Sequence, residues 1–135
     1  MTERDDDFDF FRALPEIGEN DLAALIEIAT CETLPPRTEL TVEGTVPSRL
    51  CFVVEGEMLL EKNGRIRRIN PGIFVGETAF VLDDAASATV TLDRGGRCVS
   101  WEIAELRALI DRNENIAAGF DTAFKQDLAR KVASS

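Results

Sequence analysis

The sequence predicts a mainly β domain with flanking α-helices: a double-stranded β-helix, or jelly roll, of about eight strands, with an N-terminal helix and two C-terminal helices. Turn-forming residues interrupt residues 38–101 every few positions, and short runs rich in Val, Ile, Phe and Thr lie between them. Before and after this region, apolar residues recur at helical spacing. We expect one domain over residues 1–135, because a chain of this length buries roughly two-thirds of its unfolded surface.

An acidic lead-in over residues 1–9 precedes an N-terminal helical part over residues 10–33. Its apolar residues recur at helical spacing: Leu22, Leu25, Ile26 and Ile28. Asn20 and Asp21 are available as an N-cap. The pair Pro35-Pro36 ends any helix, because proline lacks the amide donor and restricts the residue before it.

The β-roll is expected over residues 34–101. Its strongest local signal is Asn63-Gly64, which favours a tight hairpin between Met58–Lys62 and Arg65–Ile69. We predict two further antiparallel pairs: Leu50–Val54 with Met58–Leu60 around Glu55-Gly56, and Ala88–Leu92 with Arg97–Trp101. Trp101 is expected to anchor the core at the point where strand gives way to helix.

Residues 102–135 are expected to form two closing helices, the second capped by Asn113 or Asn115. The second helix carries apolar residues at steps of four: Ile116, Phe120, Phe124, Leu128 and Val132. Such a row covers a wide stripe, which packs on the roll, on another subunit, or on both.

Charge and composition exclude several classes of function. The chain has 15 basic and 25 acidic residues, and its net charge of −10 opposes binding to nucleic acid or to anionic membranes. It contains no histidine and no tyrosine, which excludes Ser-His-Asp and Cys-His catalysis and every metal site that needs imidazole. We therefore predict a non-enzyme with no catalytic residues, no metal site and no cofactor.

The cellular location is predicted from the cysteines and the N-terminus. Cys31, Cys51 and Cys98 are odd in number and show no C-x-x-C spacing, which indicates a reducing compartment. The N-terminus is acidic and the apolar runs are short, so neither a signal peptide nor membrane insertion is expected. We expect a cytoplasmic protein.

The chain resembles the cyclic nucleotide-binding domain family, with the β-roll of the catabolite activator proteins, along nearly its whole length. The stretch Leu50–Glu57 resembles the family's recurring "Leu-x-Phe-Val-x-x-Gly-Glu", and Asn70–Phe80 together with Ala86–Val90 resembles its phosphate-binding cassette. Leu34–Leu40 and Glu43-Gly44 resemble the family's first strand and turn. Within this sequence, we expect no counterpart of the DNA-reading helices of the activators after Val132.

The resemblance implies a ligand site built from Gly76, Glu77, Thr78, Ala86, Ser87 and Ala88. Gly76 lets the backbone adopt positive φ, and a helical turn from Glu77 would present amides to an anion. In the family, the glutamate matching Glu77 binds the ribose 2′-hydroxyl. The amides matching Thr78, Ser87 and Ala88, with the Ser87 hydroxyl, reach the cyclic phosphate. Thr122, Lys125 and Gln126 lie where family members often contact the purine, although a polar helix face explains them equally well.

The cassette departs from the family pattern at its cationic position. Ala86 stands where nucleotide-binding members have an arginine, and this loss predicts an affinity weaker by roughly ten- to a hundred-fold. Asp83 and Asp84 add negative charge to the same loop. Arg94 or Arg97 would supply the missing cation only if residues 93–96 fold toward the cassette. We interpret Arg65, Arg67 and Arg68 as solvated strand edges, with Arg65 and Arg67 on one face and Arg68 on the other.

In its C-terminal third the chain is most similar to the Popeye-domain branch and its bacterial relatives. Thr89–Leu92, Arg97–Glu102 and Lys125–Val132 carry this likeness. Those proteins also lack the cassette arginine, and vertebrate members are regarded as cAMP binders. The branch's Asp-Ser-Pro-Glu motif is missing here, with Val75–Thr78 in the corresponding region.

The sequence therefore predicts a regulatory sensor module that binds a cyclic mononucleotide, cAMP or cGMP, weakly or by altered contacts. The alternative is a ligand-free degenerate domain that binds a protein partner or forms a homodimer through the Phe120 and Phe124 face of its C-terminal helix. A third interpretation is a soluble piece or descendant of a membrane-linked protein.

Overall fold

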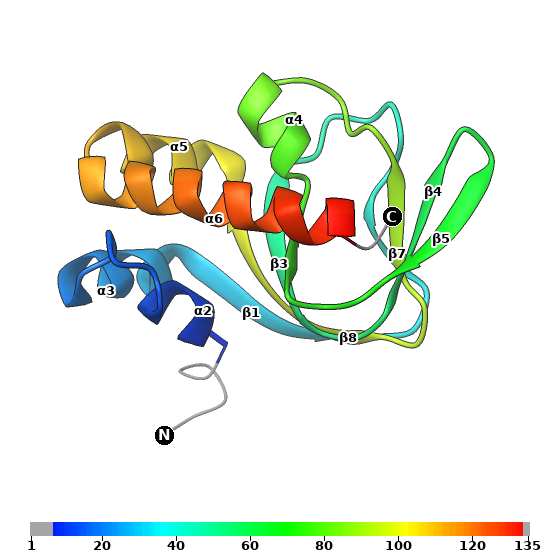
Figure 1. The fold of residues 1–135 in the computed structure, drawn as a ribbon, viewed down its shortest axis with the longest axis horizontal. Helices are drawn as coiled ribbons and strands as arrows, with labels where there is room; N and C mark the ends of the chain where they lie inside the picture. The colour runs from blue at the N-terminus through cyan, green and yellow to red at the C-terminus, as the bar shows by residue number, and fades with distance from the viewer. Residues whose placement is uncertain (1–6, 134–135) are drawn as a thin grey trace.

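The computed structural model describes residues 7–133, with side chains as far as residue 129, and shows a β-roll capped at one side by helices (Figure 1). Most of the predicted acidic lead-in lies outside the described residues. Two helices come first, α2 (Asp9–Arg12) and α3 (Glu19–Ile28), and three follow the cassette strand: α4 (Glu77–Leu82), α5 (Ile103–Asp111) and α6 (Glu114–Ala133). The eight predicted strands are confirmed as β1 (Ala29–Leu34), β2 (Thr38–Thr41), β3 (Arg49–Glu55), β4 (Met58–Lys62), β5 (Arg65–Ile69), β6 (Ile73–Val75), β7 (Thr89–Leu92) and β8 (Gly96–Glu102).

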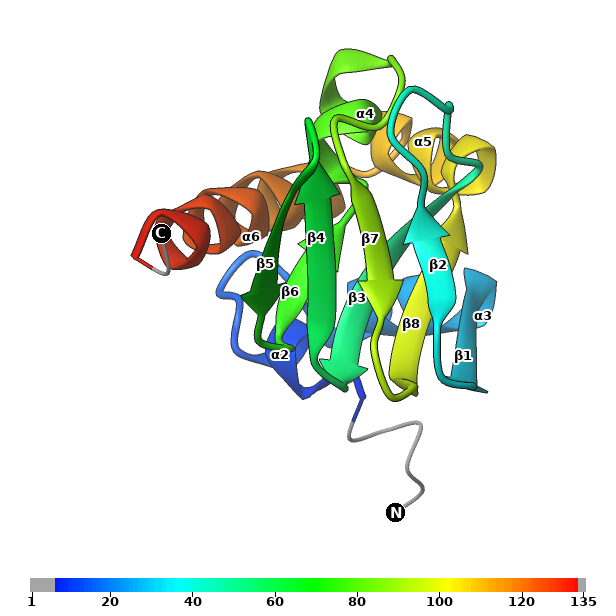
Figure 2. The same cartoon turned by 90° about the vertical axis from the view of Figure 1, so that its right-hand side faces the viewer.

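The strands form two antiparallel four-stranded sheets that face one another (Figure 2). One has the order β1-β8-β3-β6 and the other β2-β7-β4-β5. The Asn63-Gly64 hairpin is confirmed, with Met58 opposite Ile69 and Lys62 opposite Arg65. Both residues of this turn have positive φ, as a tight hairpin of this kind requires.

The two other predicted strand pairs are wrong. β3 pairs with β6 and β8, not β4, and β7 pairs with β2 and β4, not β8. In both cases the connecting turn carries the chain from one sheet to the other. Gly56, with φ of 110°, lies in the first of these turns, and a methyl group there would overlap the Gly95 carbonyl in the second.

Strand β1 corrects the predicted extent of the N-terminal helical part. Residues 29–34 pair with β8, with Ala29 opposite Trp101, so the helix ends at Ile28. Asp21 does not occupy the N-cap position, which is Gly18; its carboxylate accepts a hydrogen bond from the Gly18 N–H at 3.0 Å. At the start of α6, Asn113 is the cap, accepting from the Ile116 N–H at 3.1 Å.

The central strands are buried on both faces, which explains their continuous apolar sequence. On β3, Phe52 faces the helices while Cys51 and Val53 face the interior of the roll. β6 repeats this pattern with Phe74 between Ile73 and Val75. Trp101 is fully buried as predicted, and its indole N–H donates to the Leu25 carbonyl at 3.0 Å.

The apolar stripe of α6 packs within the chain. Phe120 is 2% exposed and its ring contacts Phe11, Phe74 and Trp101. Phe124 is half-buried against Phe74 and Phe80. Phe120 is therefore not available to a partner, because its ring lies in the core between the helices and the roll, and a partner or dimer contact through the C-terminal helix stays a prediction.

Candidate functional site

A cavity of about 390 Å³ lies between the roll and α4, and all six site residues predicted from the sequence line it. Gly76, Glu77 and Thr78 come from the junction of β6 with α4, and Ala86, Ser87 and Ala88 come from the segment before β7. Ala86 and Ala88 are buried, whereas Thr78 and Ser87 are exposed. The two stretches thus share one wall of one cavity, and their role as ligand contacts stays a prediction.

Gly76 forms the turn between β6 and α4. Its φ of 93° lies in the left-handed region, where glycine carries no steric penalty. Its carbonyl accepts the first bond of the helical turn, from the Phe80 N–H at 3.0 Å. Glu77 follows directly as the first residue of α4, so the backbone reversal places this half-buried carboxylate at the cavity wall.

The end of α4 is fixed to α5 by Arg107. Its Nη2 donates to the Phe80 carbonyl at 2.7 Å, and the guanidinium lies 4.7 Å from the centre of the Phe80 ring. Asp83, in the left-handed conformation, places a carboxylate oxygen 3.5 Å from the same guanidinium. Asp84 accepts a hydrogen bond from the Ala85 N–H.

Neither Asp83 nor Asp84 lines the cavity, and the Asp83 side chain is 86% exposed. The expectation that both carboxylates oppose an anion at the cassette is therefore corrected. Asp83 lies beside Arg107, and Asp84 is exposed.

The segment before β7 is held by the loop between β2 and β3. The Ala86 N–H donates to the Thr45 carbonyl at 3.0 Å, and the Ala86 carbonyl accepts from the Gly44 N–H at 2.9 Å. The buried Thr41 hydroxyl donates to the Ala88 carbonyl at 3.0 Å. These bonds fix the backbone on both sides of Ser87.

Two cations from the β4–β5 hairpin, Lys62 and Arg67, also line the cavity. The predicted alternation along β5 is confirmed, because Arg68 faces the other way and pairs with Glu57 and Asp93. Arg67 is exposed on the edge strand β5, as its interpretation as a solvated edge residue requires, and its side chain also borders the cavity. The sequence contained a signal for this position of Arg67. The Asn63-Gly64 hairpin sets Arg67 opposite Leu60, which faces the cavity.

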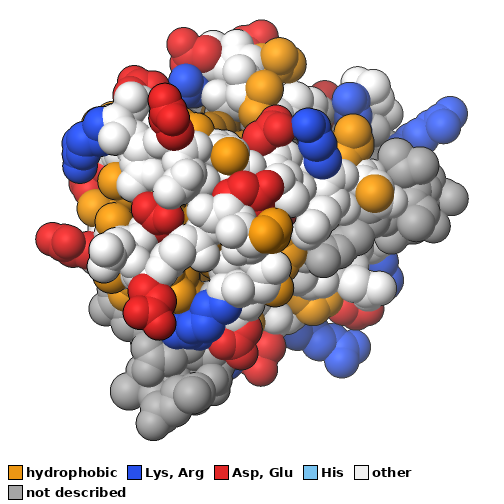
Figure 3. All heavy atoms as spheres, turned by 60° about the vertical axis from the view of Figure 1, so that its left-hand side comes forward, with side chains coloured by type: hydrophobic (Ala, Val, Ile, Leu, Met, Phe, Trp, Pro, Cys, Tyr) orange, Lys and Arg blue, Asp and Glu red, His pale blue; other side chains and the backbone are white. Residues whose placement is uncertain are grey.

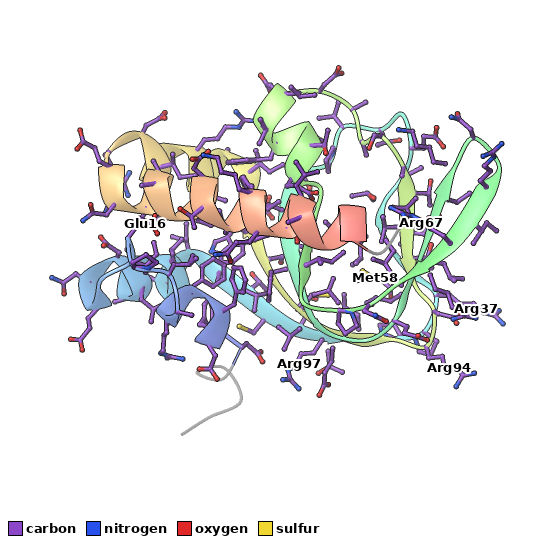
Figure 4. The ribbon with its side chains drawn as sticks, viewed as in Figure 1. Glu16, Arg37, Met58, Arg67, Arg94 and Arg97 are labelled. Atoms are coloured by element: carbon purple, nitrogen blue, oxygen red, sulfur yellow. The ribbon has the colours of Figure 1, made fainter. Side chains whose placement is uncertain are left out.

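Arg94 and Arg97 do not supply a cation to the cassette. Arg97 pairs with the buried Asp7 at 2.9 Å and with Glu55 at 3.2 Å. Arg94 is exposed, and both arginines lie at the lower edge of the roll in Figure 4, away from α4.

Among the α6 side chains described, as far as residue 129, the one that lines the cavity is Leu128, which is 63% exposed. The residues considered as purine contacts lie elsewhere. The Thr122 hydroxyl donates to Glu16 at 2.6 Å, and Lys125 pairs with Asp121 at 2.9 Å on an exposed part of the helix. Gln126 is exposed and does not line the cavity. These positions agree with the interpretation of the three residues as part of a polar helix face.

A second cavity, of about 340 Å³, lies beside β2 and is lined by Cys51 and Cys98 among other residues. Burial raises the pKa of the Cys51 thiol to about 11 and that of Cys98 to about 12. These thiols stay protonated at neutral pH.

Within residues 7–129, no group of three or more His, Cys, Asp or Glu side chains is placed to hold a metal ion. In the described part of the chain, no helix has the length and apolar character needed to cross a membrane. On the face in Figure 3, acidic side chains are spread among uncharged ones, in agreement with the net charge of −10.

The model of the cyclic nucleotide-binding domain family matches residues 31–113, which include strands β2 to β8, most of β1 and the six predicted site residues. No curated protein sequence matches the chain.

Three solved structures illustrate the likeness in fold. A putative cyclic nucleotide-binding protein from Geobacter metallireducens is 17% identical, with a TM-score of 0.76 over 90% of this chain and 96% of that one. A structure described as Sp-2Cl-cAMPS bound to PKAR CBD2 is 14% identical, with a TM-score of 0.66 over 93% and 89%. The Thermus thermophilus catabolite activator protein is 16% identical, with a TM-score of 0.66 over 87% of this chain and 58% of that one. At these identities the likeness shows the fold alone.

Proposed function

The chain belongs to the cyclic nucleotide-binding domain family, and from this premise we propose that it is a non-catalytic regulatory module whose cavity binds a cyclic mononucleotide, cAMP or cGMP. The observation that carries the proposal is that all six residues expected from the cassette line a single cavity. Its volume of about 390 Å³ falls in the range of roughly 300–1,000 Å³ usual for small-molecule sites.

Each part of the nucleotide is assigned to a part of the wall. Glu77 would accept a hydrogen bond from the ribose 2′-hydroxyl, because it is the one carboxylate among the described lining residues. The N–H groups of Ser87 and Ala88, with the Ser87 hydroxyl, would donate to the cyclic phosphate. Apolar side chains would cover the base: Leu60, Ile73, Val75, Val90 and Leu128.

The affinity is expected to be modest, because Ala86 cannot pair with the phosphate. Loss of one charge-assisted contact weakens binding by roughly ten- to a hundred-fold. Asp83 and Asp84 lie outside the cavity lining and Asp83 pairs with Arg107, which reduces the further repulsion that their sequence position suggests. The Popeye-like residues near the end of the chain favour the same proposal, since that branch also lacks the arginine.

Occupancy would be communicated to α6. Leu128 of α6 lines the cavity, and Asp127 beside it is hydrogen-bonded to the backbone of β6, another wall of the cavity. A ligand shifts a helix only through contacts that differ between two states. The Leu128 side chain is such a contact, because it is 63% exposed here and would be covered by a bound base.

Calorimetric titration with cAMP and with cGMP, at ligand concentrations up to the millimolar range, tests the proposal. We expect saturable heat and a rise in melting temperature with at least one nucleotide. Glu77→Gln should weaken binding, whereas Glu61→Gln, which removes a charge from the opposite face of β4 and does not line the cavity, should leave it unchanged. The absence of heat and of a melting shift with both nucleotides would remove the proposed function.

A further inference from the structure

We propose that Lys62, with Arg67 beyond it, supplies the positive charge that Ala86 lacks, so that the ligand's phosphate lies between Ser87 and the β4–β5 hairpin. The inference rests on the proposed function for the identity of its ligand. It assigns the anion-binding role to a strand next to the cassette.

The strand register places Lys62 beside the cassette. β4 pairs with β7 so that Leu60 lies opposite Val90 and Glu61 opposite Thr89. The next position of this antiparallel register sets Lys62 opposite Ala88. Neighbouring strands are about 4.8 Å apart, a distance that a lysine side chain easily spans.

The direction of the side chain follows from the alternation along β4. Met58 is fully buried inside the roll and Leu60 lines the cavity, so Lys62, two residues on, points to the same side. Arg67 lies opposite Leu60 on β5, one strand farther from the cassette. Figure 4 shows Arg67 on the hairpin near the end of α6.

The charges around the cavity favour an anion, although the whole chain is acidic. The described lining residues include two cations, Lys62 and Arg67, and one carboxylate, Glu77. Asp83 and Asp84 are not part of the lining. The local charge therefore has the opposite sign to the net charge of −10. Lys62 and Arg67 are exposed at the rim, so their attraction should weaken as salt is added.

A role in protecting the sheet edge does not explain Lys62. Charged residues on edge strands prevent pairing with other chains. β2 and β5 are the edge strands of this sheet, whereas β4 lies between β7 and β5. Lys62 is the last residue of β4, paired with Arg65 on β5 and one position beyond the last pair with β7, Glu61 with Thr89. It faces the cavity from an inner strand and is therefore placed for a ligand.

The test compares Lys62→Gln and Lys62→Arg with Arg68→Gln, which removes the same charge from the opposite face of the same hairpin. Two probes are used: inorganic phosphate, followed by the amide shifts of Ser87 and Ala88 in ¹H–¹⁵N spectra, and cAMP and cGMP, followed by calorimetry. We expect Lys62→Gln to weaken binding of either probe by roughly three- to ten-fold. Lys62→Arg and Arg68→Gln should remain close to the wild type.

The two probes separate the inference from the proposed function. If nucleotide binds and Lys62→Gln binds it equally well, the function stands and the assignment of Lys62 is wrong. If phosphate shifts Ser87 and Ala88 only when residue 62 is a cation, but neither nucleotide binds, the anion site stands and the nucleotide function fails. If phosphate does not move these amides in the wild type and neither nucleotide binds, both are overturned.

Discussion

The buried carboxylate of Asp127 accepts a hydrogen bond through Oδ1 from the backbone N–H of Phe74, at 3.0 Å. This bond joins α6 to β6, the short strand whose Ile73 and Val75 line the candidate site. A buried polar group without such a partner costs free energy, so the bond fixes where α6 lies on the roll.

Replacing Asp127 with alanine should lower the free energy of unfolding by roughly 1–3 kcal/mol, because the Phe74 N–H would lose its partner inside the protein. Urea denaturation followed by tryptophan fluorescence measures this, since Trp101 lies in the same core. Asp121→Ala is the matched control, because that carboxylate is exposed and pairs only with Lys125 among the described residues. Equal effects of the two variants would contradict a structural role for Asp127.

Thr41→Val should destabilise the protein by about 1 kcal/mol or more while preserving side-chain shape, since the buried Ala88 carbonyl loses its hydrogen bond. Thr38→Val is the control, because its hydroxyl donates to the Pro35 carbonyl at an exposed position. Comparison of the urea midpoints of the two variants decides the prediction. A larger loss of stability in Thr38→Val than in Thr41→Val would show that the Thr41 hydroxyl does not hold the segment before β7.

The cysteines should differ in reactivity, because the thiolate is the nucleophile. Burial raises the pKa of Cys51 to about 11 and of Cys98 to about 12, whereas Cys31 is only half-buried. Iodoacetamide at pH 8 should therefore label Cys31 first in the native protein, and all three in urea. Mass spectrometry of peptides locates the label. Fast native labelling of Cys51 or Cys98 would show that the roll interior opens readily.

Acid should reduce the contribution of Asp21 to stability. Hydrogen bonds from the Gly18 N–H and then from the Asn113 amide lower its pKa below the ordinary value of 3.8. A lowered pKa stabilises the folded protein above pH 3.8, and this contribution is lost as the pH falls below 3.8 through the folded-state pKa. The stability advantage of wild type over Asp21→Asn should therefore be present at pH 6 and shrink at pH 3. Unfolding curves at the two pH values measure this difference in the free energy of unfolding. The same difference at both pH values would contradict a lowered pKa for Asp21.

The sequence predicted the features that depend on local chemistry. The Asn63-Gly64 hairpin, the burial of Trp101 and the two closing helices follow from turn geometry and periodicity, and the structure has them. The strands that pair with β3 and β7 could not be predicted from the local sequence. Short apolar runs buried on both faces show no alternation, so nothing local in Leu50–Val54 indicates that its neighbour is β8 and not β4.

The candidate site was predicted in part. The resemblance located the six cassette residues, because they lie in two short sequence stretches, 76–78 and 86–88, that match the family's pattern in order. Lys62, Arg67 and Leu128 reach the cavity from other elements, and the pairing of β4 with β7 that brings Lys62 near Ala88 is a tertiary feature. The direction of Asp83 likewise depends on Arg107, a residue distant in sequence.

The alternation of strands between the two sheets has a consequence for how the chain folds. Among the described strands, only β4 and β5 pair with their neighbour in sequence. Ala29 of β1, by contrast, pairs with Trp101 of β8, which is distant in sequence. Closing such long loops costs conformational entropy before stabilising contacts form. Proteins dominated by pairings between distant residues therefore fold on timescales of about milliseconds to seconds. We expect the β4–β5 hairpin to form early and the β1–β8 seam to form last, which makes refolding slow for a protein of this size.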